Sequence, residues 1–138
     1  MTNYQLTNDI PTAQEYLALR TACGLSPRGL AASTRGLQNS VYMVCLREVG
    51  DNRLIGMGRI VGDGGTAYQL TDIAVVPNYQ GQGLGKVIMG HLMAFVDQKI
   101  DPLAYVSLIA DRPADALYRQ FGFRETAPDS LGMYLKPR

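Results

Sequence analysis

Apolar residues recur with two periods along this chain, and the changes of period delimit its predicted elements. Residues 3–7 predict a short first strand. The stretch PTAQEYLALRTACG, residues 11–24, then has its apolar residues at helical spacing. Pro11 suits the first turn of this helix, Arg20 falls off its apolar face and Gly24 ends it. We therefore expect a strand and a helix at the start of the chain.

A second, weaker helix is predicted in SPRGLAASTRGLQNS, residues 26–40. Ser26 is the expected N-cap and Pro27 the expected first helical residue. Gly29 and Gly36 lower the helix propensity of the segment. We expect a short helix with little stability of its own.

Three strands follow, because the period shortens to that of a β-strand. The apolar runs at 40–49 and 53–62 flank the turn EVGDNR and predict a hairpin. The stretch GDGGT at 62–66 predicts another tight reversal, and YQLTDIAVV at 68–76 is the third strand, which Pro77 ends. An antiparallel meander is the result.

The second half of the chain begins with a glycine-rich turn, PNYQGQGLGK at residues 77–86. A helix is predicted after it, with one apolar stripe made of Leu84, Val87, Ile88, His91, Leu92 and Phe95. The run LAYVSLIA at 103–110 is another strand, and the intervening helix makes it a parallel neighbour of the third strand. The sheet is therefore expected to be mixed.

The chain is predicted to close with one helix and two strands. RPADALYRQ at 112–120 is a short helix that Gly122 ends. FRETA at 123–127 and GMYLK at 132–136 then read as the last two strands.

Length and charge exclude several classes of function. The 138 residues suit one domain, 1–138, and the 13 Lys and Arg against 12 Asp and Glu give no basic surface for nucleic acid or a membrane. Without an N-terminal leader or an apolar run long enough to span a bilayer, a cytoplasmic location is expected. Cys23 and Cys45 lack metal-ligand spacing, so we expect no metal and two reduced structural thiols, with a disulfide as the alternative.

The glycine turn has the composition of a phosphate-binding loop but the register of neither common type. A P-loop needs four residues between its glycines and Ser or Thr after its lysine, whereas Gly81 to Gly85 is one residue short and Val87 follows the lysine. A dinucleotide fingerprint fails as well, because its third glycine would fall on Lys86 or Ile88. A turn at a helix N-terminus can still bind a pyrophosphate through free N–H groups, or be only a tight turn.

Two motifs together resemble the general N-acetyltransferase (GNAT) superfamily. Its acetyl-CoA loop has Gln or Arg, two residues, Gly, one residue, and Gly or Ala, which fits Gln80, Gly83 and Gly85. Its second motif ends in Tyr, three residues, Gly and Phe, which fits Tyr118 and the residues after it. The resemblance covers roughly residues 40–135, and the first motif is also similar to glucosamine-6-phosphate N-acetyltransferases. It implies an α/β fold of the α+β type, with a mostly antiparallel six- to seven-stranded sheet and about four helices.

The resemblance assigns a binding role to each part of the motif. The family's fourth and fifth strands splay apart, so pantetheine would pair with the backbone of Ile73, Ala74 and Val75. The pyrophosphate would bind the N–H groups of Gln80, Gly81, Gln82, Gly83, Leu84 and Gly85. Lys86 would lie near the 3′-phosphate or only extend into solvent, and Asp111 replaces an Asn that often contacts the cofactor arm.

Acetyl transfer from a thioester to an amine needs a neutral amine, oxyanion stabilisation and a proton for the thiolate. Tyr118 is the predicted general acid, although a helical tyrosine also packs on a sheet. Asp72 is the predicted base, through water rather than directly, although a strand carboxylate can equally hydrogen-bond a neighbouring loop. The expected activity is transfer of acetyl from acetyl-CoA to a primary amine of a small molecule in a ternary complex. Two alternatives stay open, an acyl-cysteine enzyme using Cys23 or Cys45 and a non-catalytic acyl-CoA sensor. A homodimer is also open.

Overall fold

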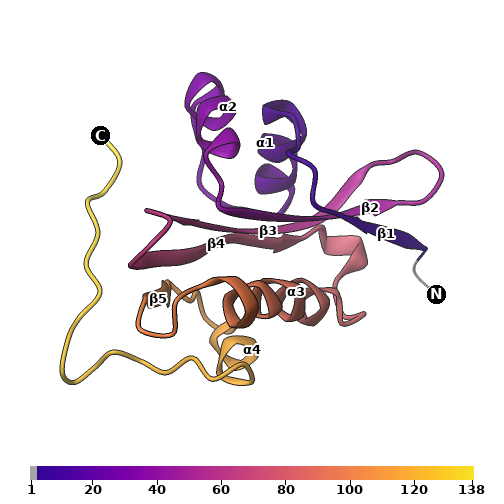
Figure 1. Ribbon diagram of the computed structural model, residues 1–138. Coiled ribbons are helices and arrows are strands. Elements are labelled where there is room, and N and C mark those ends of the chain that lie inside the picture. The colour runs from indigo at the N-terminus through magenta and orange to yellow at the C-terminus, as the bar shows by residue number, and fades with distance from the viewer. Residues whose placement is uncertain (1–2) are drawn as a thin grey trace.

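The computed structural model describes residues 3–138, which form one mixed sheet with helices on both faces (Figure 1). Its strand order is β1-β2-β3-β4-β5, antiparallel from β1 to β4 and parallel between β4 and β5. The strands are β1 (Tyr4–Thr7), β2 (Tyr42–Glu48), β3 (Leu54–Gly62), β4 (Ala67–Val75) and β5 (Tyr105–Leu108). The predicted meander and its parallel neighbour are thereby confirmed.

Two helices cover each face of the sheet, as Figure 1 shows. On one face lie α1 (Ala13–Ala22) and α2 (Leu30–Gln38), and on the other α3 (Leu84–Lys99) and α4 (Asp115–Arg119). A short 3₁₀ turn, η1 (Pro77–Tyr79), links β4 to the glycine turn. No helix within residues 3–138 is long and apolar enough to cross a membrane.

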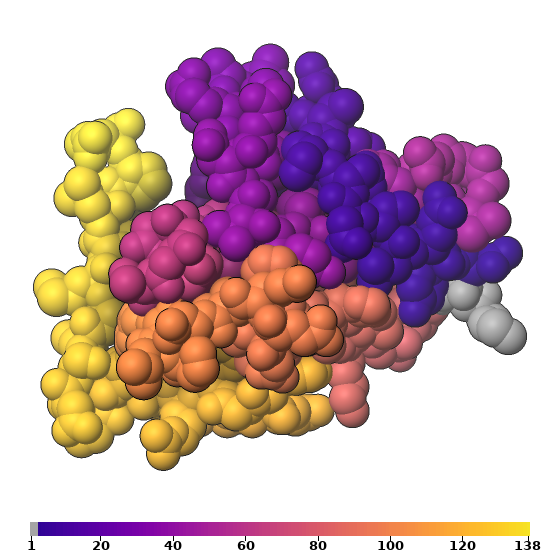
Figure 2. Space-filling model, in the orientation of Figure 1, coloured from indigo at the N-terminus to yellow at the C-terminus, as the bar shows by residue number. Residues whose placement is uncertain are grey.

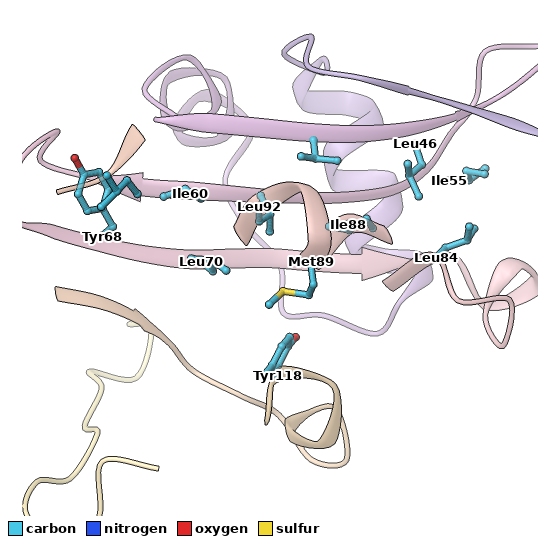
Figure 3. Packing of buried hydrophobic residues seen from close by; sticks show 12 residues of the cluster. Leu46, Ile55, Ile60, Tyr68, Leu70, Leu84, Ile88, Met89, Leu92 and Tyr118 are labelled. Carbon is cyan, nitrogen blue, oxygen red and sulfur yellow. The ribbon is translucent and has the colours of Figure 1, made fainter. Parts of the chain in front are cut away.

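The main core lies between the sheet and α3 (Figure 3). Ile88, Met89 and Leu92 of α3 are completely buried against strand residues such as Ile60 and Leu70. Each such side chain contributes about 1.5–3 kcal/mol by leaving water. The predicted apolar stripe is confirmed except at His91, which is exposed on the outer side of the helix.

Both early helices begin later than predicted. Thr12, not Pro11, starts α1: its hydroxyl accepts the N–H of Glu15, and the Glu15 carboxylate accepts the N–H of Thr12, which is a capping box. Gly29 is the N-cap of α2, so the predicted cap Ser26 lies in the preceding loop. The prediction that Arg20 lies off the buried face is also wrong, because Arg20 is only 5% exposed.

The two predicted closing strands are absent, which leaves five strands in the described part of the chain instead of the expected six or seven. Gly122, at φ 92°, ends α4 as predicted, but the chain from residue 123 to 138 forms no strand. In Figures 1 and 2 this segment stands out as an arm at the side of the molecule. An apolar strand pattern needs a neighbouring strand to form a ladder, and within residues 3–138 this segment pairs with none.

Candidate active site

Strands β4 and β5 separate halfway along, which leaves part of β4 with a free edge. Their parallel pairing runs only from Ala67, opposite Tyr105, to Leu70, opposite Leu108. Residues 71–75 continue beside β3, but no strand among the described residues pairs with them on the β5 side. The predicted pantetheine residues Ile73, Ala74 and Val75 lie in this segment. An extended ligand of peptide-like geometry could pair with such an edge.

A bulge in β4 lies next to this free edge. Met57 pairs with Ala74 and Arg59 with Thr71, so β4 carries one more residue than β3 between these pairs. Asp72 lies in the bulge with φ 59°, a left-handed conformation that a residue within a strand rarely adopts. Backbone strain of this kind persists only where surrounding contacts hold it.

Three donors hold the Asp72 carboxylate. Arg20 Nη1 lies 2.5 Å from Oδ1, and Arg59 Nε lies 2.7 Å from Oδ2. The hydroxyl of Tyr16 donates to Oδ2 at 2.9 Å. The side chains of Asp72, Arg20 and Arg59 are only 5%, 6% and 14% exposed, so the charges lie largely out of water. Burial raises the pKa of Tyr16, and the neighbouring carboxylate raises it further, so Tyr16 stays a donor.

This cluster disfavours the predicted role of Asp72 as a base. A base needs a lone pair directed at the substrate or at a water, whereas both oxygens of Asp72 already accept charge-assisted hydrogen bonds. The cluster instead joins α1, β3 and the β4 bulge. Tyr16, Arg20 and Arg59 were not among the residues predicted for the site. The four-residue spacing of Tyr16 and Arg20, which places both on one face of α1, is the sequence signal that indicates the pair.

The glycine turn presents unused N–H groups at the start of α3. Gly81 and Gly83 have φ 80° and 79°, and Gly83 is the N-cap of the helix. The first backbone bond of α3 runs from the Val87 N–H to the Gly83 carbonyl. Within the described residues, the backbone N–H groups of 81–86 donate to no acceptor. They form a site suited to an anion, strengthened by the helix dipole.

Gln80 differs from the rest of the turn. Its N–H already donates to the Pro77 carbonyl at 3.2 Å, and its side-chain Nε2 donates to the Val75 carbonyl at 2.9 Å. Gln80 therefore fixes the turn to the end of β4, and the free donors start at Gly81. Lys86 is exposed, which fits either of its two predicted roles.

Tyr118 points from α4 toward the sheet. It is 9% exposed and packs in the main core, where Figure 3 shows its ring next to Met89. Burial raises the pKa of its phenol, and the negative charge of Asp111 adds to this, so Tyr118 remains protonated at neutral pH. Asp111 itself is exposed, and its carbonyl accepts the N–H of Ala114.

The two cysteines are free thiols. Burial raises the pKa of Cys45 to about 12 and also raises that of Cys23. Both therefore remain thiols near neutral pH, which disfavours an acyl-cysteine route. Among residues 3–138, no three His, Cys, Asp or Glu side chains gather as a metal-binding group.

Comparison with known proteins assigns this arrangement to a family. Residues 38–125 match the profile of the acetyltransferase (GNAT) domain. The chain belongs to the GNAT acetyltransferase family. Histone acetyltransferase TAP1 of Glycine max is 30% identical over 129 residues, 87% of this chain and 55% of that protein. The uncharacterized N-acetyltransferase ycf52 of Porphyra purpurea is 31% identical over 104 residues, 74% of this chain and 59% of that protein. This GNAT chain thus spans a little over half of either relative.

Two solved acetyltransferase structures share the fold over nearly the whole chain. A probable acetyltransferase of unknown function from meticillin-resistant Staphylococcus aureus is 50% identical, with TM-score 0.90 over 97% of this chain and 99% of that one. Glucosamine-6-phosphate N-acetyltransferase from Arabidopsis thaliana is 14% identical, with TM-score 0.70 over 96% of this chain and 97% of that one. The second likeness shows the fold alone and leaves the acceptor open.

Proposed function

We propose that this chain is a single-domain N-acetyltransferase, spanning residues 1–138, that moves acetyl from acetyl-CoA to a primary amine of a small molecule. One observation carries the proposal: the free edge of β4 at residues 71–75 leads directly into a glycine turn with unused N–H groups. A strand edge suits the amide groups of pantetheine, and helix-start N–H groups suit a pyrophosphate. Membership of the GNAT family supports the same ligand.

Binding would place each part of acetyl-CoA against a different element. The backbone of Ile73, Ala74 and Val75 would pair with pantetheine and hold the thioester oxygen as it becomes an oxyanion. The N–H groups of 81–86 would hold the pyrophosphate, and Lys86 is near enough in sequence to meet a phosphate at the turn. Gln80 would position the turn, and Asp111 would influence Tyr118 by its charge.

The reaction would proceed by direct attack within a ternary complex. The amine nitrogen forms a bond to the thioester carbon, and the carbon–sulfur bond then breaks. The departing thiolate has a conjugate pKa of about 8.5, so the Tyr118 hydroxyl can supply its proton and recover one from solvent. The amine releases its proton to water, because Asp72 is already held by two arginines. Asp72 would then position the β4 bulge.

Calorimetry with acetyl-CoA and CoA tests the cofactor assignment. We expect saturable binding by the full chain and much weaker binding by Gly83→Ala, since a methyl group at φ 79° costs about 1–2 kcal/mol and distorts the turn. Gly90→Ala is the matched control, because Gly90 lies within α3 with open space around its Cβ position. Folded wild-type protein that binds neither ligand would overturn the proposal.

A non-catalytic acyl-CoA sensor is the second candidate function. It is favoured by Asp72, the one carboxylate predicted as the base, because both of its oxygens already accept hydrogen bonds from arginines. Such a sensor would bind acetyl-CoA and never release CoA in response to an amine. For either candidate we expect a cytoplasmic location, which imaging of a tagged chain would test.

A further inference from the structure

Positive charge gathers on the side of the sheet that α1 and α2 cover (Figure 1). Residues 16–47 contain no Asp or Glu, although the whole chain is nearly balanced, with 13 Lys and Arg against 12 Asp and Glu. Arg47 is balanced by Asp9 and Glu15. The remaining charged residues of the two helices, the loop between them and the strand face beneath are Arg20, Arg28, Arg35, Arg59 and Asp72. Such a surplus attracts anions.

Arg59 keeps donors free beside the bulge of β4. Its Nε donates to Asp72 at 2.7 Å, and its Nη1 donates to the Gly36 carbonyl and the Ser40 hydroxyl, each at 3.1 Å. Among residues 3–138, Nη2 donates to no acceptor. No buried side-chain nitrogen or oxygen of these residues lacks a partner, so Nη2 reaches solvent. The guanidinium is therefore fixed through two nitrogens and presents the third outward.

Two polar side chains next to Arg59 are also unused. Thr71 lies opposite Arg59 in the β3–β4 register, so their side chains share a face, and Gln69 lies two residues earlier on that face. Both are half-buried, and neither side chain makes a hydrogen bond within the described part of the chain. They extend the polar surface from Arg59 to the free edge of β4.

The proposed reaction directs the amine to this surface. The acyl carbon of acetyl-CoA would lie at the free edge of β4, and Tyr118 would approach its sulfur from the face that α3 and α4 cover (Figure 3). The face of α1 and α2 is then the one left for the amine. An amine that reaches the acyl carbon from this face passes the Nη2 end of Arg59.

We propose, as an extension that rests on the proposed function, that the acceptor amine carries a carboxylate or phosphate and that Arg59 binds this group through Nη2. Hydrogen bonds from arginine to such anions are shorter and stronger than those between neutral groups. An acceptor with several positive charges, such as a polyamine, would be repelled. The surplus positive charge also favours loss of a proton from the incoming ammonium, which the reaction requires and which Asp72 is not free to accept.

Pairs of amines that differ in one acidic group test the acceptor class. The carboxylate pairs are glycine, β-alanine and longer ω-amino acids against their amides, and the phosphate pair is phosphoethanolamine against ethanolamine. At equal ionic strength we expect kcat/KM to be roughly tenfold or more higher for the acid in the carboxylate or the phosphate pairs, and added salt should reduce this preference. The amides have less basic amines, so basicity works against the expected preference. Equal use of both members in every pair would overturn the proposal.

The substitution Arg59→Gln tests the residue. It should bring the acid-to-neutral ratio of kcat/KM close to one, and because the ratio is measured within one variant, weaker acetyl-CoA binding affects both amines alike. Lys99→Gln is the control, since it removes an exposed positive charge at the end of α3 on the opposite face and should leave the ratio unchanged. Circular dichroism checks that each variant is folded. A ratio in folded Arg59→Gln equal to that of the wild type would refute the role of Arg59.

Nuclear magnetic resonance of the wild-type complex with CoA measures binding without turnover. The Arg59 Nε–H, held by Asp72, is assigned by the loss of its signal in Arg59→Lys, which keeps a positive partner for the carboxylate. Phosphoethanolamine or an ω-amino acid should shift this signal, and the neutral partner should not. A shift without acetyl transfer would support the anion site and reject the proposed function. Acetyl transfer with no shift from any acid would support that function and reject the anion site.

Discussion

The substitution Asp72→Asn isolates the charge that holds the β4 bulge. Asparagine has the same shape and tolerates the left-handed conformation that Asp72 adopts, at φ 59°. Its amide can accept from one arginine, but its NH₂ group then faces the other, so Arg20 and Arg59 lose a buried counter-charge. Removing one partner of a buried ion pair costs about 3–5 kcal/mol.

That loss should be easy to measure. For a domain of this size, the unfolding temperature falls by roughly 3–4 °C for each kcal/mol, so we expect a decrease of roughly 9–20 °C in a thermal melt. Asp97→Asn is the matched control, because Asp97 is exposed on α3 and should change the melt by less than about 2 °C. D72N/R59Q should recover part of the loss, since it removes one uncompensated charge.

The result bears on mechanism as well as on stability. If Asp72 positions β4, residual activity in Asp72→Asn should show a raised KM for acetyl-CoA and an unchanged pH profile. If Asp72 is the base, kcat should fall and the acidic limb of the profile should disappear. An unfolding temperature of Asp72→Asn within about 1 °C of that of the Asp97→Asn control would refute the proposal that Asp72 holds the β4 bulge.

Two further predictions concern Tyr118, the proposed general acid, and Glu15, a member of the capping box of α1. Tyr118→Phe should lower kcat by about 10²-fold or more while the Kd for CoA stays within about twofold, and an unchanged kcat would remove Tyr118 from the mechanism. Because burial raises the pKa of Tyr118 above 10.0, wild-type activity should not fall as pH rises to about 10. The hydrogen bond from Arg47 lowers the pKa of Glu15 from its usual 4.5, so this pair stabilises the fold above about pH 4.5 and ceases to do so as pH falls through the lowered value. Glu15→Gln should therefore lower the free energy of unfolding in urea by about 1–3 kcal/mol at pH 7 and by less at pH 3. An equal decrease at both pH values would contradict a stabilising ion pair between Arg47 and Glu15.

Most helices and strands could be predicted from the sequence, because the spacing of apolar residues and the turn residues between them specify each element locally. The glycines after Pro77 and the apolar stripe of α3 indicated the turn and helix, and the structure has both. The meander followed from its apolar runs and turns. Element boundaries were less accurate at α1, where the Thr12 and Glu15 capping box outweighs the preference of Pro11 for a first turn.

Long-range pairings were not predictable from local pattern. Arg20 reads as a surface residue, yet it lies 52 positions from the carboxylate that it contacts. The segments at 123–127 and 132–136 have strand-like sequence, but a strand forms only where it pairs with a neighbour, and within residues 3–138 these segments pair with no strand. The sequence thus predicted the strand, turn and helix that form the candidate cofactor site better than the buried charges behind them.

Amine-dependent release of CoA tests the central claim most directly. Purified wild-type protein and acetyl-CoA would be mixed with amino sugars, polyamines, amino acids, aminoglycosides or peptides with free amines. The thiol of released CoA would be detected by the absorbance of its product with a thiol reagent, and the acetylated amine by its mass. We predict that at least one amine increases CoA release well above the hydrolytic background and gains one acetyl group, and that Tyr118→Phe suppresses this. Tight binding of acetyl-CoA with no amine-dependent release across the panel would contradict acetyl transfer and identify a sensor.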